Sequence, residues 1–570
     1  MNIFQRYKSL ILTKALQLYP ALPHDIVFSV ESPKDNSHGD IASNIALIAS
    51  KKVGIPPLEI AKAIASELLA QQDIIKAEIA APGFINLSIA SSAWHEELHN
   101  ILFSGKSYGN SDIGKGALVN LEFVSCNPTG PMHIGHARGA VFGDALARIM
   151  TKTGFKVHKE FYINDAGNQI KTLIQSAHAR YMQAIGQYVE IPEGCYPGEY
   201  LIPVGKDLAE VFGDSLKNLN LSEVVIRTRD FVLSKMLDLI KADLALLGVY
   251  HDKFVSEQSE LHDVGLLQDA LDQLSEKGLV YNGVLEAPKG KTIEDWEPQP
   301  QSIFKSTAFG DDVDRVVVKS NGEYTYFVGD IAYHYNKIER GFKDMILILG
   351  SDHIGYVKRI TAAVNAIDDK ARIDIKITQL VNLLKNGQPY KMSKRSGNFV
   401  TVKDMVEELG ADIIRFMMLT RKGDTVLDLD FALAKEESKD NPIFYVQYAY
   451  ARASSILRKN QNKSLDFSKI DLGCIASKEE LQLIQKMAQW PKVLEVAAQL
   501  HEPHRVTYYL YELATQFHSL WTGGSSGEKI RFVVEGDMRL TDARMGLAQA
   551  VQNTLASGFD AIGVTPMERM

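Results

Sequence analysis

Cysteine is scarce in this sequence, which has only Cys126, Cys195 and Cys474 among its 570 residues. The three cysteines are far apart and odd in number, which excludes a disulfide scaffold and a zinc ribbon built from paired cysteines. Such scarcity is typical of proteins from a reducing compartment. We therefore expect no structural metal bound by the protein.

Long apolar runs are missing as well. No segment contains the run of about 18 apolar residues that a membrane-spanning helix needs. Charged residues also interrupt the N-terminal segment too often for a signal peptide. We expect a soluble, cytoplasmic protein with no membrane partner.

Positive charge is not in excess either. The chain has 62 Lys and Arg residues against 70 Asp and Glu residues, for a formal net charge of −8. This balance argues against a protein that coats nucleic acid regardless of sequence, but it leaves RNA binding through local basic patches open. A hydrophobic share of 45% is typical of a globular protein.

A chain of 570 residues is too long for one hydrophobic core and indicates about three or four domains. Hydrophobic periodicity divides it into residues 1–112, 113–440 and 441–570. The last part is almost purely helical, which predicts an all-α helix bundle. Its expected helices are 444–459, 478–498, 503–521 and 541–562.

The first part, residues 1–112, has the mixed pattern of a compact α+β module. Helical periodicity runs over 41–53 and again over 58–69. Two short strands around a Pro-Gly turn are expected within 79–89.

The middle part opens with alternating apolar residues at 117–124, then a loop with Asn, Pro and Gly, then helical periodicity over 134–152. A strand, a loop and a helix in this order begin a doubly wound, Rossmann-like α/β domain. The polar, helical stretch from about 170 to 300 indicates an insertion between the two halves of the sheet. Further buried strands are expected at 157–163, 324–328, 345–349 and 373–384.

The first cluster with chemical potential is His133-Ile-Gly-His136, where the first strand of this domain gives way to its first helix. Ligands bind at this edge of open α/β sheets, and a helix N-terminus attracts phosphate. Two histidines here can donate hydrogen bonds to phosphate oxygens, and Gly135 leaves room for a flat base. Two ordinary histidines at a helix start are the alternative, but the position favours a nucleotide site.

The second cluster is Lys391-Met-Ser-Lys-Arg395, which places three cations within five residues ahead of Gly397. Lysine is a compact charge suited to a leaving pyrophosphate, so the cluster predicts a loop that closes on polyphosphate. By itself such a loop is more often simply solvated. Both clusters occur in one domain, the first at the start of the first half of the sheet and the second after its second half, and this pairing favours the nucleotide interpretation.

Together the two clusters resemble the HIGH and KMSKS signatures of the class I aminoacyl-tRNA synthetases, with Arg395 in place of the final serine. Along nearly its whole length the chain is similar to the arginyl-tRNA synthetases of this class. The segments that carry the similarity are 122–127, 162–169, 329–333, 349–353, 441–448 and 566–570.

This resemblance implies an enzyme that activates L-arginine with ATP and transfers it from arginyl-adenylate to the 3′ end of tRNA(Arg), releasing AMP and pyrophosphate. It implies that Mg²⁺ enters with ATP and that the enzyme is a monomer. The catalytic groups would be His133 and His136 on the phosphates, and Lys391 and Lys394 on the leaving pyrophosphate. The implied ATP contacts are His133, Gly135, His136, Lys391, Met392, Ser393 and Lys394.

An arginine side chain needs a carboxylate that accepts hydrogen bonds from a planar guanidinium. By resemblance, Tyr326 and Asp330 match the family's guanidinium-binding pair. The full set of implied arginine contacts is Glu122, Ser125, Asn127, His133, Tyr326, Asp330 and His353.

Three of these residues have other interpretations. Asp330 could cap a helix that begins near residue 331, and Tyr326 could simply pack in a strand. Glu122 places a charge in an apolar strand, which is costly unless a partner compensates it. The substrate guanidinium or a lysine of the protein would serve as that partner.

The helical bundle is expected to bind the anticodon, with Tyr448 and Arg452 on consecutive turns of one helix. The resemblance adds Met570 as an anticodon contact, and helical spacing adds Trp521. The resemblance also implies that the N-terminal module touches the outer corner of tRNA, with Asn86 as a candidate contact. Aromatic residues at this spacing are equally typical of helix packing, and Asn86 could instead satisfy a turn.

Three rival functions are considered. Another class I synthetase is disfavoured, because a convincing zinc-ligand set for the cysteine enzyme is missing and because Glu122 and Asp330 suit a cation rather than glutamate. A simple nucleotidyltransferase would leave the second cluster and the helical bundle unexplained. An inactive RNA-binding relative is disfavoured by the intact His133, His136, Lys391 and Lys394.

Overall fold

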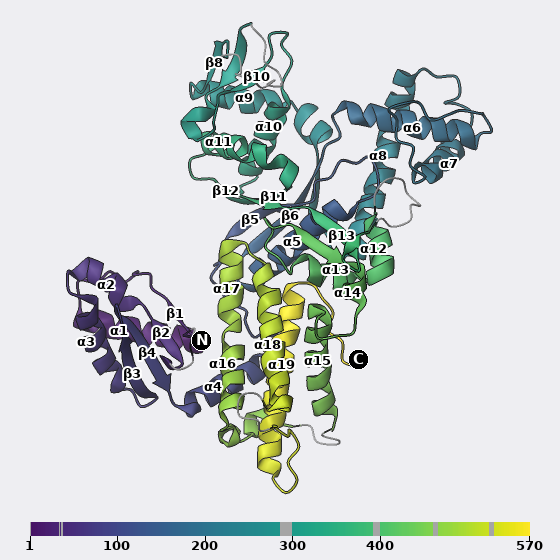
Figure 1. Ribbon diagram of the computed structural model, residues 1–570. Helices are drawn as coiled ribbons and strands as arrows, with labels where there is room; N and C mark the ends of the chain where they lie inside the picture. Colours follow the sequence, from purple (N-terminus) through teal and green to yellow (C-terminus); the bar gives the residue numbers. More distant parts are fainter. Residues whose placement is uncertain are drawn as a thin grey trace.

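Figure 1 shows an N-terminal module, a central sheet with two lobes beyond it, and a set of long C-terminal helices. This computed structural model describes residues 2–33, 35, 38–285, 299–390, 400–459, 465–523 and 529–570. None of the described helices is long and apolar enough to cross a membrane.

The N-terminal module is a four-stranded antiparallel sheet, in the order β1-β2-β4-β3, with three helices. The elements are α1 (Ile3–Leu18), β1 (Val30–Glu31), β2 (Ile41–Ser43), α2 (Ile45–Val53), α3 (Pro57–Leu69), β3 (Ile74–Ala80) and β4 (Phe84–Ile89). The strand pair expected within 79–89 is confirmed as β3 and β4. The helix expected over 41–53 is wrong at its start, because Ile41–Ser43 pair with β4 instead.

After β4 the chain leaves the module and joins the C-terminal helices. Helix α4 (Ser91–Ser104) and the short η2 (Gly105–Ser107) pack against those helices. The Tyr108 carbonyl accepts hydrogen bonds from Trp490 Nε1 at 3.0 Å and from Ser557 Oγ at 2.8 Å. Residues 91–108 are therefore part of the C-terminal core by contact, although they directly follow the first sheet.

The central sheet has five parallel strands in the order β12-β11-β5-β6-β7. The chain starts in the middle, moves outward to one edge, and returns to build the other edge, so the doubly wound class is confirmed. The strands are β5 (Leu118–Glu122), β6 (Lys156–Ile163), β7 (Lys253–Ser256), β11 (Asp344–Gly350) and β12 (Arg372–Thr378). The order reverses between β5 and β11, which is where such sheets bind ligands. Helix α5 (Ile134–Lys152) connects β5 to β6, as predicted.

Two lobes are inserted between strands of this sheet. In sequence, the first lies before β7 and the second lies after it. The first contains α6 (Asn168–Ala184), α7 (Leu201–Phe212) and α8 (Leu221–Leu246), which enclose an apolar core of their own. The second contains η3 (Gln258–His262), α9 (Leu266–Glu276), β8 (Val280–Gly283), β9 (Gln301–Phe304), η4 (Ser306–Phe309) and β10 (Arg315–Val318). The region expected as one helical insertion thus contains a strand of the central sheet and the beginning of a three-stranded antiparallel sheet.

Two of the expected strands differ in the structure. The strand expected at 324–328 is wrong, since α10 (Tyr326–Glu339) begins there with Thr325 as its N-cap. The strand expected at 373–384 is two strands of different sheets, β12 and β13 (Val381–Lys385). The remaining elements between the central sheet and the bundle are η5 (Ser351–Tyr356), α11 (Val357–Ile367), β14 (Gln388–Pro389), α12 (Val402–Leu409), α13 (Ala411–Met418), β15 (Leu427–Asp430) and α14 (Phe431–Lys435).

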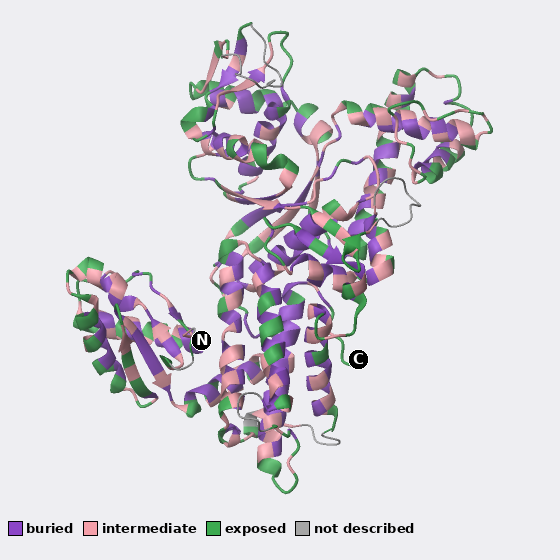
Figure 2. Ribbon diagram, viewed as in Figure 1, coloured by how far each residue is buried: buried purple, intermediate pink, exposed green. Residues whose placement is uncertain are grey.

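The C-terminal part is the expected all-α bundle. Its helices are α15 (Pro442–Lys459), α16 (Lys478–Ala488), α17 (Trp490–Leu500), α18 (His504–Thr522) and α19 (Met538–Ala561), with short η6 (Phe467–Lys469) and η7 (Leu472–Cys474) turns. The single helix expected over 478–498 is two helices, because Pro491 cannot continue the preceding helix and lies instead in the first turn of α17. Figure 2 shows buried residues along the inner sides of these helices and around α5.

Candidate active site

The first signature forms the N-terminus of α5. His133 is the N-cap, and its Nδ1 accepts a hydrogen bond from the Gly135 N–H at 3.1 Å. His136 Nδ1 accepts from the His133 N–H at 3.3 Å, and the two rings stack with centroids 3.8 Å apart. Because each Nδ1 is an acceptor, the proton of each neutral ring is on Nε2. The pair therefore presents hydrogen-bond donors at a helix N-terminus.

Burial keeps both of these imidazoles neutral. It lowers the pKa of His133, and together with the nearby His133 it lowers the pKa of His136 to about 3. The positive end of the α5 dipole acts in the same direction. The site thus offers an anion neutral donors that need no proton uptake.

The segment that follows the second signature contacts this helix end. Lys391, Met392, Ser393 and Lys394 lie outside the described residues, and the description resumes at Val400. The Val400 carbonyl accepts a hydrogen bond from the Ile134 N–H at 3.2 Å, and Thr401 forms a β-bridge with His133. The segment that follows the second signature is therefore bound to the first one.

The chain turns sharply after β5. Val124 and Ser125 have φ values of 73° and 39°, in the left-handed region that side chains other than glycine rarely adopt. Ser125 Oγ donates to Glu122 Oε1 at 2.9 Å and accepts from the Tyr162 N–H at 3.0 Å. Such backbone strain is commonly found where a site requires a particular side-chain direction.

The charge of Glu122 in its apolar strand is compensated by Lys337. Its Oε2 lies 2.5 Å from Lys337 Nζ, and both side chains are buried. Of the two partners predicted, the structure shows the lysine. Asn127 lies farther along the same turn, where it is exposed and its Oδ1 accepts from Gln169 Nε2 at 3.3 Å.

Three carboxylates gather beside this turn: Glu122 from β5, Glu257 from the segment after β7, and Asp330 from α10. Burial, followed by the charges of Glu122 and Glu257, raises the pKa of Asp330 to about 7. Burial also raises the pKa of Glu257, which accepts a hydrogen bond from the Tyr162 hydroxyl. Although Lys337 pairs with Glu122 and Arg359 acts on Asp330, the like charges still disfavour the ionised form of Asp330, and a further cation at this position would relieve their repulsion. Within the described ranges, no three His, Cys, Asp or Glu side chains are grouped to hold a metal ion.

Glu257 and Tyr162 were not among the predicted arginine contacts. Tyr162 lies in the segment 162–169 that carries the family resemblance, so a signal for it was present. Glu257 directly follows a four-residue strand that local periodicity did not reveal. Both lie at the carboxyl edge of the parallel sheet, which is the general signal for a ligand site.

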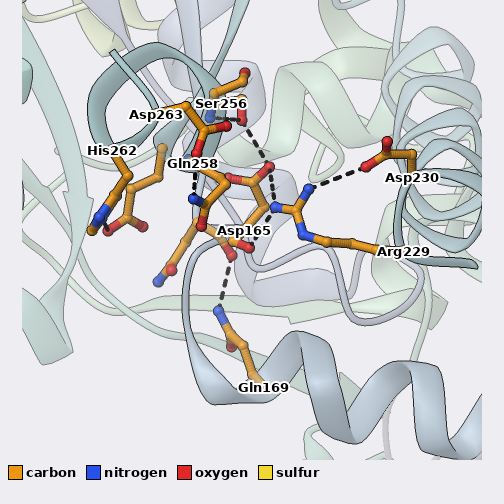
Figure 3. Close-up of polar contacts among 11 residues, drawn as sticks. Asp165, Gln169, Arg229, Asp230, Ser256, Gln258, His262 and Asp263 are labelled. Carbon is orange, nitrogen blue, oxygen red and sulfur yellow. Dashed lines mark hydrogen bonds and ion pairs between the residues drawn. The ribbon is translucent and has the colours of Figure 1, made fainter. Parts of the chain in front are cut away.

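A partly buried network centred on Asp165 is shown in Figure 3, and it fixes the backbone on either side of Glu257. Asp165, in the loop after β6, accepts hydrogen bonds from the Gln258 N–H at 2.9 Å and from Ser256 Oγ at 2.8 Å. Arg229 on α8 reaches the same carboxylate at 3.3 Å. The network holds both neighbours of Glu257 and links the first lobe to the central sheet.

Tyr326 and Asp330 lie one turn apart on α10, so their side chains project from the same face of the helix. Asp330 is not a helix cap, since Thr325 takes that position, and the interpretation of Tyr326 as strand packing is wrong. Tyr326 is 82% exposed at the helix start. His353 is in the η5 turn after β11, exposed, and 3.3 Å from the Asp352 carboxylate.

Family profiles match all three parts of the chain. The profile described as "Arginyl tRNA synthetase N terminal domain" matches residues 5–89. The profile described as "tRNA synthetases class I (R), catalytic domain" matches 97–431, and "DALR anticodon binding domain" matches 446–570.

Whole-chain comparisons agree with these profiles. Arginine–tRNA ligase from Ruegeria pomeroyi is 48% identical over 581 residues, and that from Wolbachia pipientis wMel is 50% identical over 574 residues, each covering 100% of both chains. The chain belongs to the arginyl-tRNA synthetases. It is therefore an ATP-dependent ligase that activates arginine and transfers it to the 3′ end of its tRNA. The Thermus thermophilus arginyl-tRNA synthetase structure shares the fold, with a TM-score of 0.73, 21% identity and 100% coverage of both chains.

In this synthetase, three of the predicted tRNA contacts come together on α15 and α18. The Arg452 guanidinium lies over the Tyr448 ring at 4.5 Å and over the Trp521 ring at 4.8 Å. It also donates to the Tyr448 hydroxyl at 2.8 Å and to His518 Nδ1 at 2.9 Å. Tyr448 remains 39% exposed, so part of this aromatic surface faces solvent.

The C-terminal segment of the synthetase lies along α15, the helix that carries Tyr448. Gln447 donates to the Thr565 carbonyl at 2.8 Å and accepts from the Met567 N–H at 2.8 Å. This places Met570, which is half exposed, at the end of a segment fixed to the bundle.

Asn86 is inside β4, where it pairs with residues of β2 and β3. Its interpretation as a turn residue is therefore wrong. The side chain is buried, with 7% exposure, so it offers RNA little surface in this conformation.

Proposed function

We propose that the acidic cluster binds the arginine guanidinium, with Asp330 as the principal carboxylate. The observation that supports this assignment is the raised pKa of Asp330, which burial and two neighbouring carboxylates produce. A guanidinium supplies the missing charge and several planar donors at once. Glu257 and Glu122 would share those donors, while Tyr326 would cover the side chain from the start of α10.

The polar groups after β5 would hold the other end of the amino acid. Ser125 and Asn127 lie beyond Glu122 on the same turn, and His133 follows at the start of α5. In this proposal, they orient the arginine carboxylate toward the ATP α-phosphate, and His353 contributes from the η5 turn. Positioning of this kind can account for most of the catalysis, since the carboxylate itself is the nucleophile.

ATP would bind across the start of α5. His133 and His136 would donate from Nε2 to the phosphates, and Gly135 would leave room for the base. Lys391 and Lys394 would stabilise the departing pyrophosphate, with Met392 and Ser393 lining the nucleotide. Mg²⁺ would enter with ATP, coordinated mainly by phosphate oxygens and water.

The tRNA would contact the bundle through Tyr448, Arg452 and Trp521, with Met570 nearby. Exposed aromatic rings beside an arginine can stack on unpaired bases. We further propose that the enzyme acts as a monomer in the cytoplasm, which light scattering and fractionation would test.

The deciding experiment is ATP–pyrophosphate exchange with each of the twenty amino acids, with and without tRNA. Exchange with arginine alone, abolished by Asp330→Asn and preserved in Glu339→Gln on the exposed side of α10, supports the assignment. Arginine exchange that is unchanged in Asp330→Asn would contradict it. Exchange that appears only with tRNA would show that tRNA is needed for activation.

A further inference from the structure

Met132, directly before the first signature, is fully buried, and both of its backbone polar groups bind segments distant in sequence. Its N–H donates to Asp243 Oδ2, near the end of α8, at 2.8 Å. Its carbonyl accepts from the Val402 N–H, at the start of α12, at 2.9 Å. Met132 therefore connects the first lobe and the segment after the second signature to the first signature.

These contacts act on two consecutive peptide units. Asp243 binds the unit that ends at the Met132 N–H, and Val402 binds the unit that joins Met132 to His133. The N–H of this second unit is the donor to His136 Nδ1 at 3.3 Å. Since each peptide unit is planar, only φ and ψ of Met132 lie between the two units. Anchoring both units therefore fixes the direction of the histidine pair.

A carboxylate is energetically costly at the position of Asp243. The residue is 4% exposed, and in the described part of the chain no Lys, Arg or His nitrogen lies within the 4.0 Å of a salt bridge. The groups that face it are Lys403, which pairs with Glu407 at 3.9 Å, the like-charged Asp404, and the buried Cys126 thiol. Burial raises the pKa of Asp243 to about 6. A leucine has the same branching and carries no charge, so packing alone does not explain the carboxylate.

We propose that Asp243 is a positioning residue for ATP, which acts through the Met132 amide on His133 and His136. The proposal rests on the assignment of that histidine pair to the phosphates. The same helix, α8, carries Arg229 about four turns earlier, where it binds Asp165 of the network behind the acidic cluster. Helix α8 therefore contacts Met132, next to the histidine pair, through Asp243, and it contacts Asp165, next to the acidic cluster, through Arg229.

The test compares three variants of the full-length enzyme by ATP–pyrophosphate exchange, with tRNA present. Asp243→Leu removes the acceptor but keeps the branching of the side chain, and it is expected to lower kcat/KM for ATP by about 30- to 100-fold, with the KM for arginine changed less than about twofold. Asp243→Asn keeps an oxygen that can accept the Met132 N–H and is expected to stay within about threefold of the parent. Thr228→Val is the matched control. Thr228 is also a buried polar residue of α8, but its Oγ1 donates a hydrogen bond to the Val224 carbonyl of the same helix. It should leave both parameters unchanged.

The outcomes separate this proposal from its alternatives. An Asp243→Leu enzyme with normal kcat/KM for ATP, or an Asp243→Asn enzyme as impaired as the leucine variant, would overturn it. A parallel loss in ATP and arginine parameters together with a lower Tm would indicate a general folding defect and would also overturn it. His136→Asn provides the separate check: if that variant handles ATP normally, the histidine assignment fails, whatever Asp243 does.

Discussion

The acidic cluster and the histidine pair lie on either side of the turn after β5, and burial acts on them in opposite directions. Burial raises the pKa of Asp330 to about 7 and lowers the pKa of His136 to about 3. In both subsites the neutral form is favoured, but the consequences differ. The carboxylate becomes able to gain or lose its charge near neutral pH, whereas the imidazole is a fixed neutral donor.

With the proposed assignments, one enzyme binds a cation at the acidic cluster and a polyanion at the histidine pair. The arginine side should depend on charge, and therefore on pH. The ATP side should depend on donor geometry, and therefore on the hydrogen bonds that orient the histidines. Four changes can break or sharpen this distinction.

The largest expected effect is on the proposed arginine subsite, which depends on charge. Asp330→Asn should lower kcat/KM for arginine by about 10²–10³-fold, because the variant removes the half-buried carboxylate charge that is proposed to pair with the guanidinium. The KM for ATP should change little. Steady-state aminoacylation with arginine and ATP varied in turn measures both, and equal losses for the two substrates would count against separate subsites.

The next largest effect is on the proposed ATP subsite, which depends on hydrogen-bond donors. His136→Asn keeps an acceptor for the His133 N–H but removes the Nε2 donor, so kcat should fall by about 10²-fold. The KM for arginine should stay near that of the parent enzyme. Single-turnover adenylate formation measures the step directly, and an unchanged rate would remove His136 from the proposed phosphate contacts.

A pH profile should separate the two subsites without any mutation. Asp330 loses its charge below its raised pKa of about 7, so the KM for arginine should rise by up to about tenfold for each pH unit below 7. The KM for ATP should show no matching change, since His136 stays neutral down to a pKa of about 3. In Asp330→Asn the arginine profile should be flat, and a slope that persists would point to another group.

The smallest expected effect is on stability without substrates. The pKa of Asp330 is raised from its ordinary value of 3.8 to about 7, so its contribution to stability is present at low pH and lost as pH rises to about 7. Asp330→Asn should therefore raise the Tm of the catalytic domain at pH 8, by about 2–4 °C. The gain should shrink at pH 5, and a gain that is the same at both pH values would exclude this origin.

Local patterning was sufficient to predict the elements that form the ATP side. The strand β5 and the helix α5 have strong, regular apolar periodicity, and the two histidines follow directly from their junction. The role of Met132 was not visible, because Asp243 is 111 residues away and nothing in its own helix marks it.

The arginine side was harder to predict for a physical reason. Residues 324–328 are aromatic and β-branched, which favours a strand by propensity, yet Phe327, Val328 and Ile331 bury one face of α10. Tertiary burial overrode the local preference. Glu257 follows β7, whose pairing with β6 spans about ninety residues and leaves no local signal.

The packing of α4 has a consequence for how this protein could be divided into interchangeable parts. Trp94, Leu98 and Ile101 are buried, and α4 packs against α16 and α19. A cut after Ile89, at the last strand of the first sheet, would leave α4 in place, but it would still break the hydrogen bonds that Asn2, Gln5, Ser32 and Asp40 make with the C-terminal helices. Helix α4 is held by helices that lie some four hundred residues later in the sequence, so a substitution near the beginning of the chain has to fit side chains near its end.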